Sequence, residues 1–483
     1  MDVFFYLKCS LLVTLFNKVS GVKANPFWEQ TLDASMYSSV GVIGLPSLTN
    51  EGEGTGADVR FAAASWLDAP KLVEVFSSDS TNGTVDWSYE PESFKDTPST
   101  LAVATARHID LNRSGLVDMV VANHFQDGQG EKACFLLGFS STISAAKHLW
   151  RYNVTGNCSV DLILEGDSKP TLKLSDDGST VVFAVAVFDP KTQTDVPELH
   201  CINGQTGALI FVFRLDNERP GTSSVSMSRG GDHIAYSNGL VVYVLEKSTG
   251  TLRTKPLVRQ MVSDVHICPM GVYLLYAVND GSVVRRWNAT TEQFEITPFQ
   301  VKTPSGAPNS WIAVSHTTSV NGEGKNPGGC IAAVGWLGMG DNQGVAKVDI
   351  FSMITGKVFV SWTSKKGNGL ENFPVMAMHL GYIAVATWGN SFHASEPNLL
   401  LFHISSDKPV MEYILHGSVM AVDLIYSPYA LPPSNGQSGQ SSTNDQATVF
   451  LIAAGKQEHA TVAGRGGRCM AFHIPVKSRP PPP

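Results

Sequence analysis

The sequence predicts an all-β protein, and three observations support this fold class. Short apolar runs rich in β-branched and aromatic residues recur along the chain, whereas helical periodicity is nearly absent. Turns that contain glycine separate these runs about every ten residues. Groups of three or four runs recur roughly every 40–60 residues, a spacing typical of repeat folds. Together they predict a β-propeller of about eight four-stranded blades, with seven as the alternative.

The N-terminus differs from the rest of the chain. Residues 1–24 contain an apolar run from Leu11 to Phe16 and end in Val22-Lys23-Ala24, a pattern that predicts a signal peptide removed before Asn25. The alternatives are an uncleaved anchor and a buried first strand. We expect a single propeller domain over residues 25–476, followed by a proline-rich tail over residues 477–483 that cannot pair in a sheet.

The first expected strand is residues 27–32, and successive units then begin near residues 36, 101, 160, 222, 262, 310, 372 and 418. The last unit lacks an outer strand. We expect residues 27–32 to supply it and so to close the ring, because an open ring would leave sheet edges exposed. Residues 432–445, inside the last unit, are rich in Ser, Gly, Gln and Asn and are predicted to be disordered.

A glycine turn precedes the outer strand of several units, and an aromatic residue such as Trp87 or Phe211 follows it. The turns are Thr81-Asn82-Gly83, Gln205-Thr206-Gly207, Ser248-Thr249-Gly250 and Ile354-Thr355-Gly356. Glycine provides the positive φ that such hairpins need. This pattern resembles the repeat of quinoprotein-like (PQQ-like) propellers. Enzymes of that family would imply a calcium ion and adjacent cysteines, but this chain has no Cys-Cys pair, so the resemblance is not extended to dehydrogenase activity.

A polar loop between two expected strands has the spacing of a calcium site. Its oxygen-bearing residues stand at loop positions 1, 3, 5 and 9, around Gly115 at position 6: Asp110, Asn112, Ser114 and Asp118. The pattern resembles the calcium loop of FG-GAP repeats, with Ser114 in place of the usual Asp, which implies a weaker site. The alternatives are an Asx-rich turn without metal and, through the flanking His108 and His124, a transition-metal site.

Five sequons predict N-glycosylation, at Asn82, Asn112, Asn153, Asn157 and Asn288. A glycan on Asn112 would crowd a metal in the loop. Six cysteines remain after leader removal, and we expect bridges between residues close in sequence, with Cys158 joined to Cys134 or Cys201. Free buried thiols are the alternative for Cys134, Cys201 and Cys330.

Trp336 and Trp388 end expected inner strands of neighbouring units. They could line one mouth of the ring and stack on a sugar or an aromatic ligand, and packing between blades is the alternative. The formal net charge of −8, without a basic cluster, argues against a nucleic-acid partner. Beyond the leader, no apolar run is long enough to span a bilayer, so we expect no transmembrane anchor in the mature chain.

No set of residues in the sequence identifies a catalytic centre. We therefore expect a secreted, N-glycosylated β-propeller that binds a protein or a glycan through one face. The first alternative is a secreted propeller enzyme, either a quinoprotein-like oxidoreductase or a glycan-acting hydrolase, with its site in the central channel. The second is a structural subunit of an extracellular coat or matrix.

Overall fold

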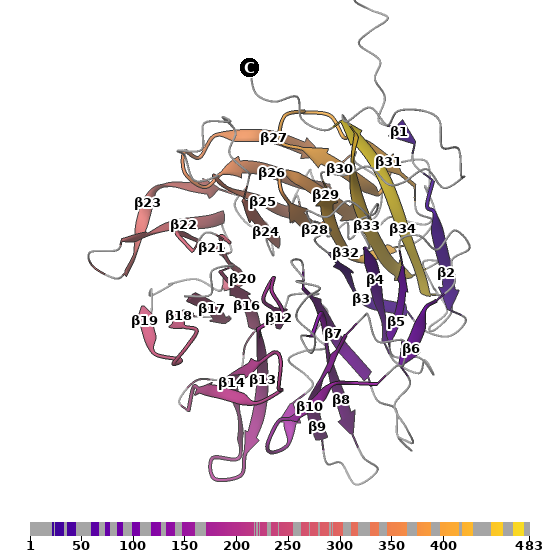
Figure 1. Ribbon diagram of the computed structural model, residues 1–483. Coiled ribbons are helices and arrows are strands. Elements are labelled where there is room, and N and C mark those ends of the chain that lie inside the picture. The colour runs from indigo at the N-terminus through magenta and orange to yellow at the C-terminus, as the bar shows by residue number, and fades with distance from the viewer. Residues whose placement is uncertain are drawn as a thin grey trace, which may run out of the picture.

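The computed structural model consists of eight sheets, antiparallel except for one short strand pair, arranged as blades around a central axis (Figure 1). The prediction of eight blades is therefore confirmed. The part of the chain that the structure describes contains strands and turns but no helix, and so no helix that could cross a membrane.

The structure describes residues 22–23, 25–32, 36–44, 59–66, 73–77, 85–89, 99–106, 117–126, 132–140, 147–159, 171–216, 218, 221, 223–228, 233–239, 241–254, 262–269, 271–278, 281–288, 291, 293–302, 311–316, 329–337, 345–364, 374–387, 397–414, 418–427, 446–456 and 467–477. The predicted insertion 432–445 lies outside these residues, as does most of the predicted leader and of the tail.

In every blade except blade 8 the strands follow one another in the chain, with the first strand innermost. Blade 1 contains β3 (Met36–Ile43), β4 (Arg60–Trp66), β5 (Val73–Ser77) and β6 (Trp87–Tyr89). Blade 2 contains β7 (Ser99–Thr105), β8 (Met119–Gln126), β9 (Lys132–Phe139) and β10 (Trp150–Asn153). Blade 3 contains β12 (Leu172–Leu174), β13 (Thr180–Asp189), β14 (Thr194–Asn203) and β15 (Leu209–Arg214), and β11 (Cys158–Ser159) also pairs with β13. Blade 4 contains β16 (Ser223–Met227), β17 (His233–Asn238), β18 (Val242–Glu246) and β19 (Leu252–Thr254).

The second half of the ring follows the same plan. Blade 5 contains β20 (Val262–Ile267), β21 (Tyr273–Val278), β22 (Gly281–Asn288) and β23 (Gln293–Lys302). Blade 6 contains β24 (Trp311–His316), β25 (Cys330–Leu337), β26 (Ala346–Ser352) and β27 (Val358–Thr363). Blade 7 contains β28 (Pro374–His379), β29 (Tyr382–Thr387), β30 (Leu399–His403) and β31 (Met411–Tyr413). Blade 8 contains β32 (Ser418–Ser427), β33 (Gln446–Lys456), β34 (Gly467–Lys477) and β2 (Trp28–Leu32).

The blades pack because the inner strands are apolar on both faces. Along β13, alternate residues point to opposite sides of the sheet. Val181 and Phe183 therefore join the apolar core shared with blade 2, whereas Val182 and Ala184 join the core shared with blade 4. An isolated blade would leave both of these faces in water, so each sheet depends on its two neighbours.

Polar side chains on innermost strands also connect neighbouring blades. The Val42 N–H donates to the Asp423 carboxylate at 2.9 Å, which links blades 8 and 1. The Ile267 N–H donates to Ser226 Oγ at 2.9 Å, which links blades 4 and 5. The Tyr426 N–H donates to His379 Nδ1 at 3.0 Å, which links blades 7 and 8. These contacts satisfy backbone donors that would otherwise be buried without a partner.

The ring is closed by an N-terminal strand, as the sequence predicts. β2 pairs antiparallel with β34 and completes blade 8. Trp28 lies in the apolar core between blades 8 and 1. Arg468 donates from Nε to Glu29 Oε1 at 2.8 Å, and the Phe27 ring stacks on His473 with ring centroids 3.7 Å apart. The first and last described segments of the propeller thus share one sheet.

A second N-terminal strand, β1 (Val22–Lys23), pairs in parallel with β31 of blade 7. It lies within residues 1–24, which the sequence predicts to be a leader. Blade 7 keeps four strands, β28 to β31, without it. Removal of the leader is therefore compatible with the fold, and the leader itself stays a prediction.

The glycine turns have a second role besides bending the chain. Gly207, Gly250 and Gly356 have φ values of 69°, 71° and 72°, as their turn positions predict. A Cβ atom at Gly207 would come within 2.8 Å of the Trp150 ring of blade 2, and one at Gly250 within 2.6 Å of the Phe211 ring of blade 3. The outer-strand aromatic of one blade therefore lies on the turn glycine of the next blade.

Two disulfides cross boundaries between blades. Cys134 on β9 is bonded to Cys158 on β11, which joins blade 2 to blade 3, and Cys268 after β20 is bonded to Cys330 on β25, which joins blades 5 and 6. Two partners were predicted for Cys158. The structure has the bond to Cys134, whereas Cys201 is a free buried thiol. The sequence did not predict the second bridge, because its cysteines are 62 residues apart.

The closing strand pair is expected to be sensitive to acid through His473. Burial lowers the pKa of this imidazole to about 4, and its Nε2 atom has no hydrogen-bond partner among the described residues. The unfolded chain takes up a proton near pH 6.5. Since the unfolded state then binds more protons between these values, stability should fall as the pH drops from about 6.5 to 4, by up to about 3 kcal/mol.

Urea denaturation at pH 7 and at pH 4.5 measures this effect. His473→Phe keeps a ring against Phe27 but cannot be protonated, so its stability should depend less steeply on pH than that of the native chain. The same pH dependence in both proteins would contradict the assignment.

Candidate functional site

The predicted calcium loop lies mostly outside the described residues. Asp110, Asn112 and Ser114 fall there, together with His108. Asp118 is described: it is buried just before β8, and its backbone N–H donates to the Phe139 carbonyl at 3.1 Å. Within the described ranges, no group of three His, Cys, Asp or Glu side chains could hold a metal ion. A calcium ion therefore stays a prediction.

The two predicted ligand-binding tryptophans are only partly described. Trp388 lies outside the described residues. Trp336 is 2% exposed and belongs to the core between blades 5 and 6, with Lys347 Nζ 5.1 Å from the centre of its ring. The Trp336 ring thus packs between blades, and ligand binding by either tryptophan stays a prediction.

Three of the five sequons fall in described segments. Asn153 and Asn157 are exposed on the segment that leads from β10 to β11, and Asn288 is half-buried at the end of β22. Asn82 and Asn112 lie outside the described residues. Both exposed sequons lie close to the Cys134–Cys158 disulfide, which fixes this segment against blade 2.

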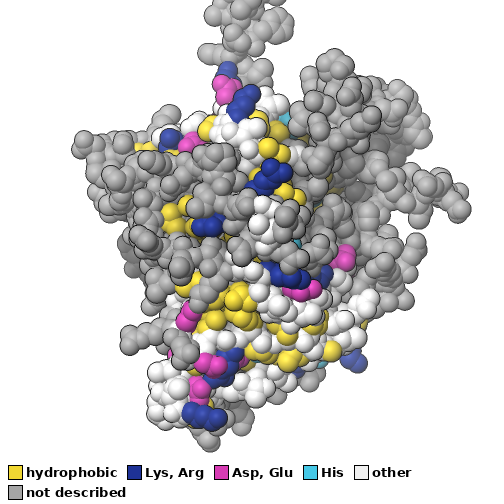
Figure 2. Space-filling view, turned by 90° about the vertical axis from the view of Figure 1, so that its left-hand side faces the viewer, with side chains coloured by type: hydrophobic (Ala, Val, Ile, Leu, Met, Phe, Trp, Pro, Cys, Tyr) yellow, Lys and Arg dark blue, Asp and Glu magenta, His cyan; other side chains and the backbone are white. Residues whose placement is uncertain are grey.

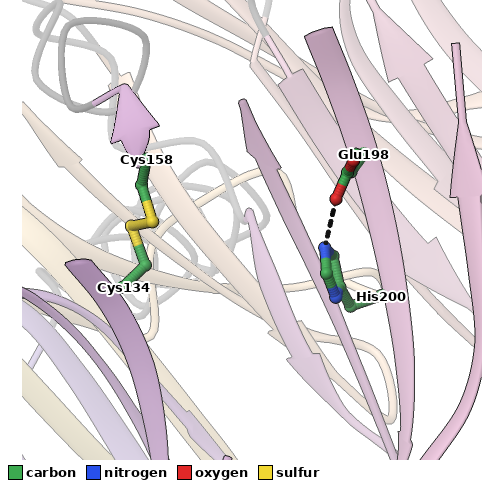
Figure 3. Close-up of a disulfide and its surroundings, with 4 residues drawn as sticks. All are labelled: Cys134, Cys158, Glu198 and His200. Carbon is green, nitrogen blue, oxygen red and sulfur yellow. Dashed lines mark hydrogen bonds and ion pairs between the residues drawn. A yellow bond between two sulfur atoms is a disulfide. The ribbon is translucent and has the colours of Figure 1, made fainter. Parts of the chain in front are cut away.

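A buried polar chain lies where blade 2 meets the outer half of blade 3. We call Tyr152, Glu198, His200 and Arg214 the rim chain. His200 Nε2 lies 3.0 Å from Glu198 Oε2, and Tyr152 Oη lies 2.7 Å from His200 Nδ1 (Figure 3 shows the Glu198–His200 contact beside the Cys134–Cys158 disulfide). A carboxylate only accepts, so the proton on His200 Nε2 donates to Glu198 and Tyr152 Oη donates to Nδ1.

Arg214 connects the rim chain to the protein surface. Its Nη1 donates to Glu198 Oε1 at 2.9 Å, its Nη2 to Asp189 at 2.6 Å and its Nε to Asp216 at 2.5 Å. These contacts raise the pKa of Arg214, with the hydrogen bond to Asp216 as the largest cause. Three carboxylates thus meet one guanidinium, so negative groups outnumber the positive one within this set of contacts.

The local sequence explains why these side chains meet. Glu198 and His200 are two residues apart on β14, so they point to the same side of the sheet, towards blade 2. Trp150 fixes the facing strand, because its Nε1 donates to the Gly204 carbonyl at 2.7 Å and its ring lies on Gly207. Tyr152, two residues further along β10, is thereby placed opposite His200.

The geometry of the rim chain fits a structural role better than a catalytic one. The side chains of Glu198 and His200 are only 9% and 4% exposed, and both ring nitrogens of His200 have partners within the protein. Burial, and secondarily the charge of Glu198, raises the pKa of Tyr152 to about 12, so the phenol keeps its proton near neutral pH. The arrangement holds β10 against β14 and positions the strand outside them, β15.

β15 carries an exposed apolar surface beside the rim chain. Leu209, Ile210 and Val212 are 48%, 42% and 40% exposed, and we call these three residues the apolar edge. The side of the molecule drawn in Figure 2 shows hydrophobic side chains gathered in its lower half, with charged side chains at their margin. Three exposed apolar side chains on one short strand indicate binding more strongly than a single one does.

Neither the rim chain nor the apolar edge was predicted from the sequence. A signal was present: Glu198 and His200 interrupt an otherwise apolar strand at a spacing that puts them on one face. Their partners Tyr152 and Arg214 lie on other strands, and only the stacking of blades 2 and 3 brings them together. The exposure of Leu209, Ile210 and Val212 follows from the outermost position of β15, which the preceding turn Gln205-Thr206-Gly207 predicts, so a signal for the apolar edge was present in the sequence as well.

Comparison with known proteins bears on the fold. No known protein family and no curated protein matches the sequence. Among solved structures, Sqt1 from Saccharomyces cerevisiae is similar over 94% of this chain and 100% of its own, with a TM-score of 0.56 and 10% identity. BamB from Moraxella catarrhalis is similar over 92% and 99%, with a TM-score of 0.44 and 12% identity.

At these identities the likeness to Sqt1 shows the fold alone, and the score for BamB carries no argument. The eight stacked sheets and their closure by β2 place the chain in the β-propeller class. The FG-GAP resemblance stays a prediction, because most of its loop lies outside the described residues.

The rim chain is expected to contribute to stability through Glu198. Glu198→Gln removes the charge that both His200 and Arg214 contact, and should lower the free energy of unfolding by about 1–3 kcal/mol. Asp216→Asn is the matched control: Asp216 contacts the same guanidinium but is 69% exposed, so its loss should matter by less than about 1 kcal/mol. Urea denaturation measures both.

A titration separates this role from simple packing. Loss of the Glu198 charge should also lower the pKa of Tyr152, because that charge opposes formation of the phenolate. The Tyr152 signal is isolated by comparing ultraviolet titrations with those of Tyr152→Phe variants. An unchanged Tyr152 titration in Glu198→Gln would contradict the proposed electrostatic link.

Proposed function

We propose that this chain is a secreted, N-glycosylated β-propeller that binds a protein partner through the apolar edge of blade 3. The observation that carries the proposal is the exposure of Leu209, Ile210 and Val212 together on one outer strand. Burying these side chains against a partner would release ordered water, with a gain of about 25 cal/mol per Å² of apolar surface. Propellers present such surfaces on a rigid ring.

The chemistry of the edge favours a protein over a glycan. Sugar rings stack on exposed aromatic faces, whereas the exposed side chains here are aliphatic. Trp150 is buried against blade 3, and Trp336 is buried between blades 5 and 6. The rings of these two tryptophans are thus engaged in packing.

Three features support secretion. The predicted leader over residues 1–24 would direct the chain to the secretory pathway. Two disulfides join blades, and such bonds persist in oxidising compartments. The sequons at Asn153 and Asn157 lie on an exposed segment, where a glycan can project into solvent.

Photo-cross-linking in secreting cells tests the binding surface. With p-benzoylphenylalanine at position 210 of the full chain, we expect an adduct of one discrete mass, whose protein is then identified and purified. The matched control is position 358, because Val358 on β27 is equally apolar and is 48% exposed on blade 6.

The purified partner should bind Ile210→Asp at least about tenfold more weakly than the native chain, whereas Val358→Asp should bind almost normally. Equal adducts at both positions, or none at position 210, would contradict the proposal.

Alkylation followed by intact mass measurement tests the compartment. The secreted protein, denatured but not reduced, should take up two alkyl groups, at the free thiols Cys201 and Cys469. Prior reduction should raise this to six, because four cysteines are bonded. Denaturation is required because burial raises the pKa of both free thiols. Full labelling without reduction would count against secretion, and an additional group would show that Cys9 is retained.

A further inference from the structure

We propose that the partner adds an extended segment to β15 as a further strand of blade 3, with a basic side chain at the Arg214 end. This inference rests on the proposed function, since it specifies the form of the partner that the apolar edge binds. Three observations carry it: backbone groups of β15 that have no partner among the described residues, five consecutive apolar residues before Arg214, and three carboxylates around that arginine.

The backbone of β15 presents unused hydrogen-bonding groups. Among the described residues, β15 pairs with β14 alone. The Leu215 N–H donates to the Pro197 carbonyl at 3.0 Å, and bonded and non-bonded positions alternate along an antiparallel ladder. The peptide groups of Phe213 therefore face β14, whereas those of Val212 and Arg214 face outward and can pair with an added strand.

Exposed sheet edges are normally protected by charges, proline or short length. Most other outer strands show such protection: β6, β19 and β31 have three residues each, β10 contains Arg151, β2 contains Glu29 and β23 contains Pro298. β15 has five consecutive apolar residues before Arg214. β27 also lacks charge, but Ser361 and Thr363 interrupt its apolar run. β15 is therefore an unprotected edge, which fits a strand that is covered in the complex.

The charges at the end of β15 define the partner further. Arg214 contacts Glu198, Asp189 and Asp216, so one positive group faces three negative ones. Asp216 remains 69% exposed and can accept a lysine or arginine of the incoming segment. An exposed ion pair contributes less than about 1 kcal/mol, so this contact would set the register of the added strand more than its affinity.

The side chains specify an alternating segment. Every second residue of an added strand would lie beside Val212 and the other side chains of the apolar edge. Apolar residues are expected at those positions and polar residues between them. A second copy of β15 fits less well. Antiparallel pairing of two such strands would bring Arg214 of each opposite the apolar end of the other. The carboxylates around each Arg214 would then gain no basic partner.

A synthetic peptide can represent the partner strand. The probe is a fluorescein-labelled peptide of four alternating Val-Thr pairs, capped at both ends and carrying one lysine at either the first or the last position. Binding to the full-length glycoprotein is measured by fluorescence anisotropy at low and high salt. One of the two lysine placements should bind, and replacing that lysine by glutamate should weaken binding severalfold at low salt only.

The backbone contribution is tested without altering the protein. N-methylation of alternate peptide residues keeps the side chains but removes the donors, and one methylated register should lower affinity at least about tenfold. On the protein, Val212→Pro should have the same effect because it removes an outward N–H, whereas Val212→Leu is the matched control and should bind normally.

If the peptides bind equally well with and without N-methylation in either register, strand addition is overturned. The cross-link at position 210 would in that case still support the proposed function. Without that cross-link, the proposed function itself fails. A concentration-dependent dimer in sedimentation velocity that is lost in Val212→Asp would assign the edge to a second copy and would also overturn the inference.

Discussion

The structure depends on the pairing of β2 with β34. Every blade has two apolar faces and can bury them only between two neighbours, so a ring satisfies all blades and an arc leaves two faces in water. The closing sheet is composed of chain segments separated by more than four hundred residues, as the Arg468–Glu29 ion pair shows. Trp28 and Phe27 both pack into the core between blades 8 and 1, so the ring is closed by side-chain packing as well as by hydrogen bonds.

Between blades, the outer contacts repeat one device. Trp150 lies on Gly207 and Phe211 lies on Gly250. The aromatic ring of one blade thus covers a turn of the next blade at a glycine, where a Cβ atom would clash with the ring. At the boundary of blades 2 and 3, this device adjoins the rim chain and the Cys134–Cys158 bond. The boundary beside the apolar edge thus combines an aromatic–glycine contact, the rim chain and a disulfide, which together support that edge.

Much of the fold could be predicted from the sequence, because its signals are local. Short apolar runs mark the strands, and turn glycines such as Gly207 mark where strands end. The spacing of the units predicted the number of blades, and it also showed that the last blade lacks a strand, which residues 27–32 supply. The candidate site could not be predicted in this way. Tyr152 and His200 come from different blades. The Cys268–Cys330 bond joins two blades through cysteines that are 62 residues apart and share no sequence motif. Such contacts depend on how sheets stack, which a single sequence does not encode in any short pattern.

The position of the two disulfides has a mechanical consequence. Both bonds lie within the ring, at the boundaries of blades 2 with 3 and 5 with 6, whereas none of the described cysteines bridges blades 8 and 1. Tension applied to the two ends of the propeller would act directly on the β2–β34 pair, which is held by non-covalent contacts alone. Under load the ring would open first between β2 and β34. The two pairs of blades joined by disulfides would stay together, including the pair that carries the apolar edge.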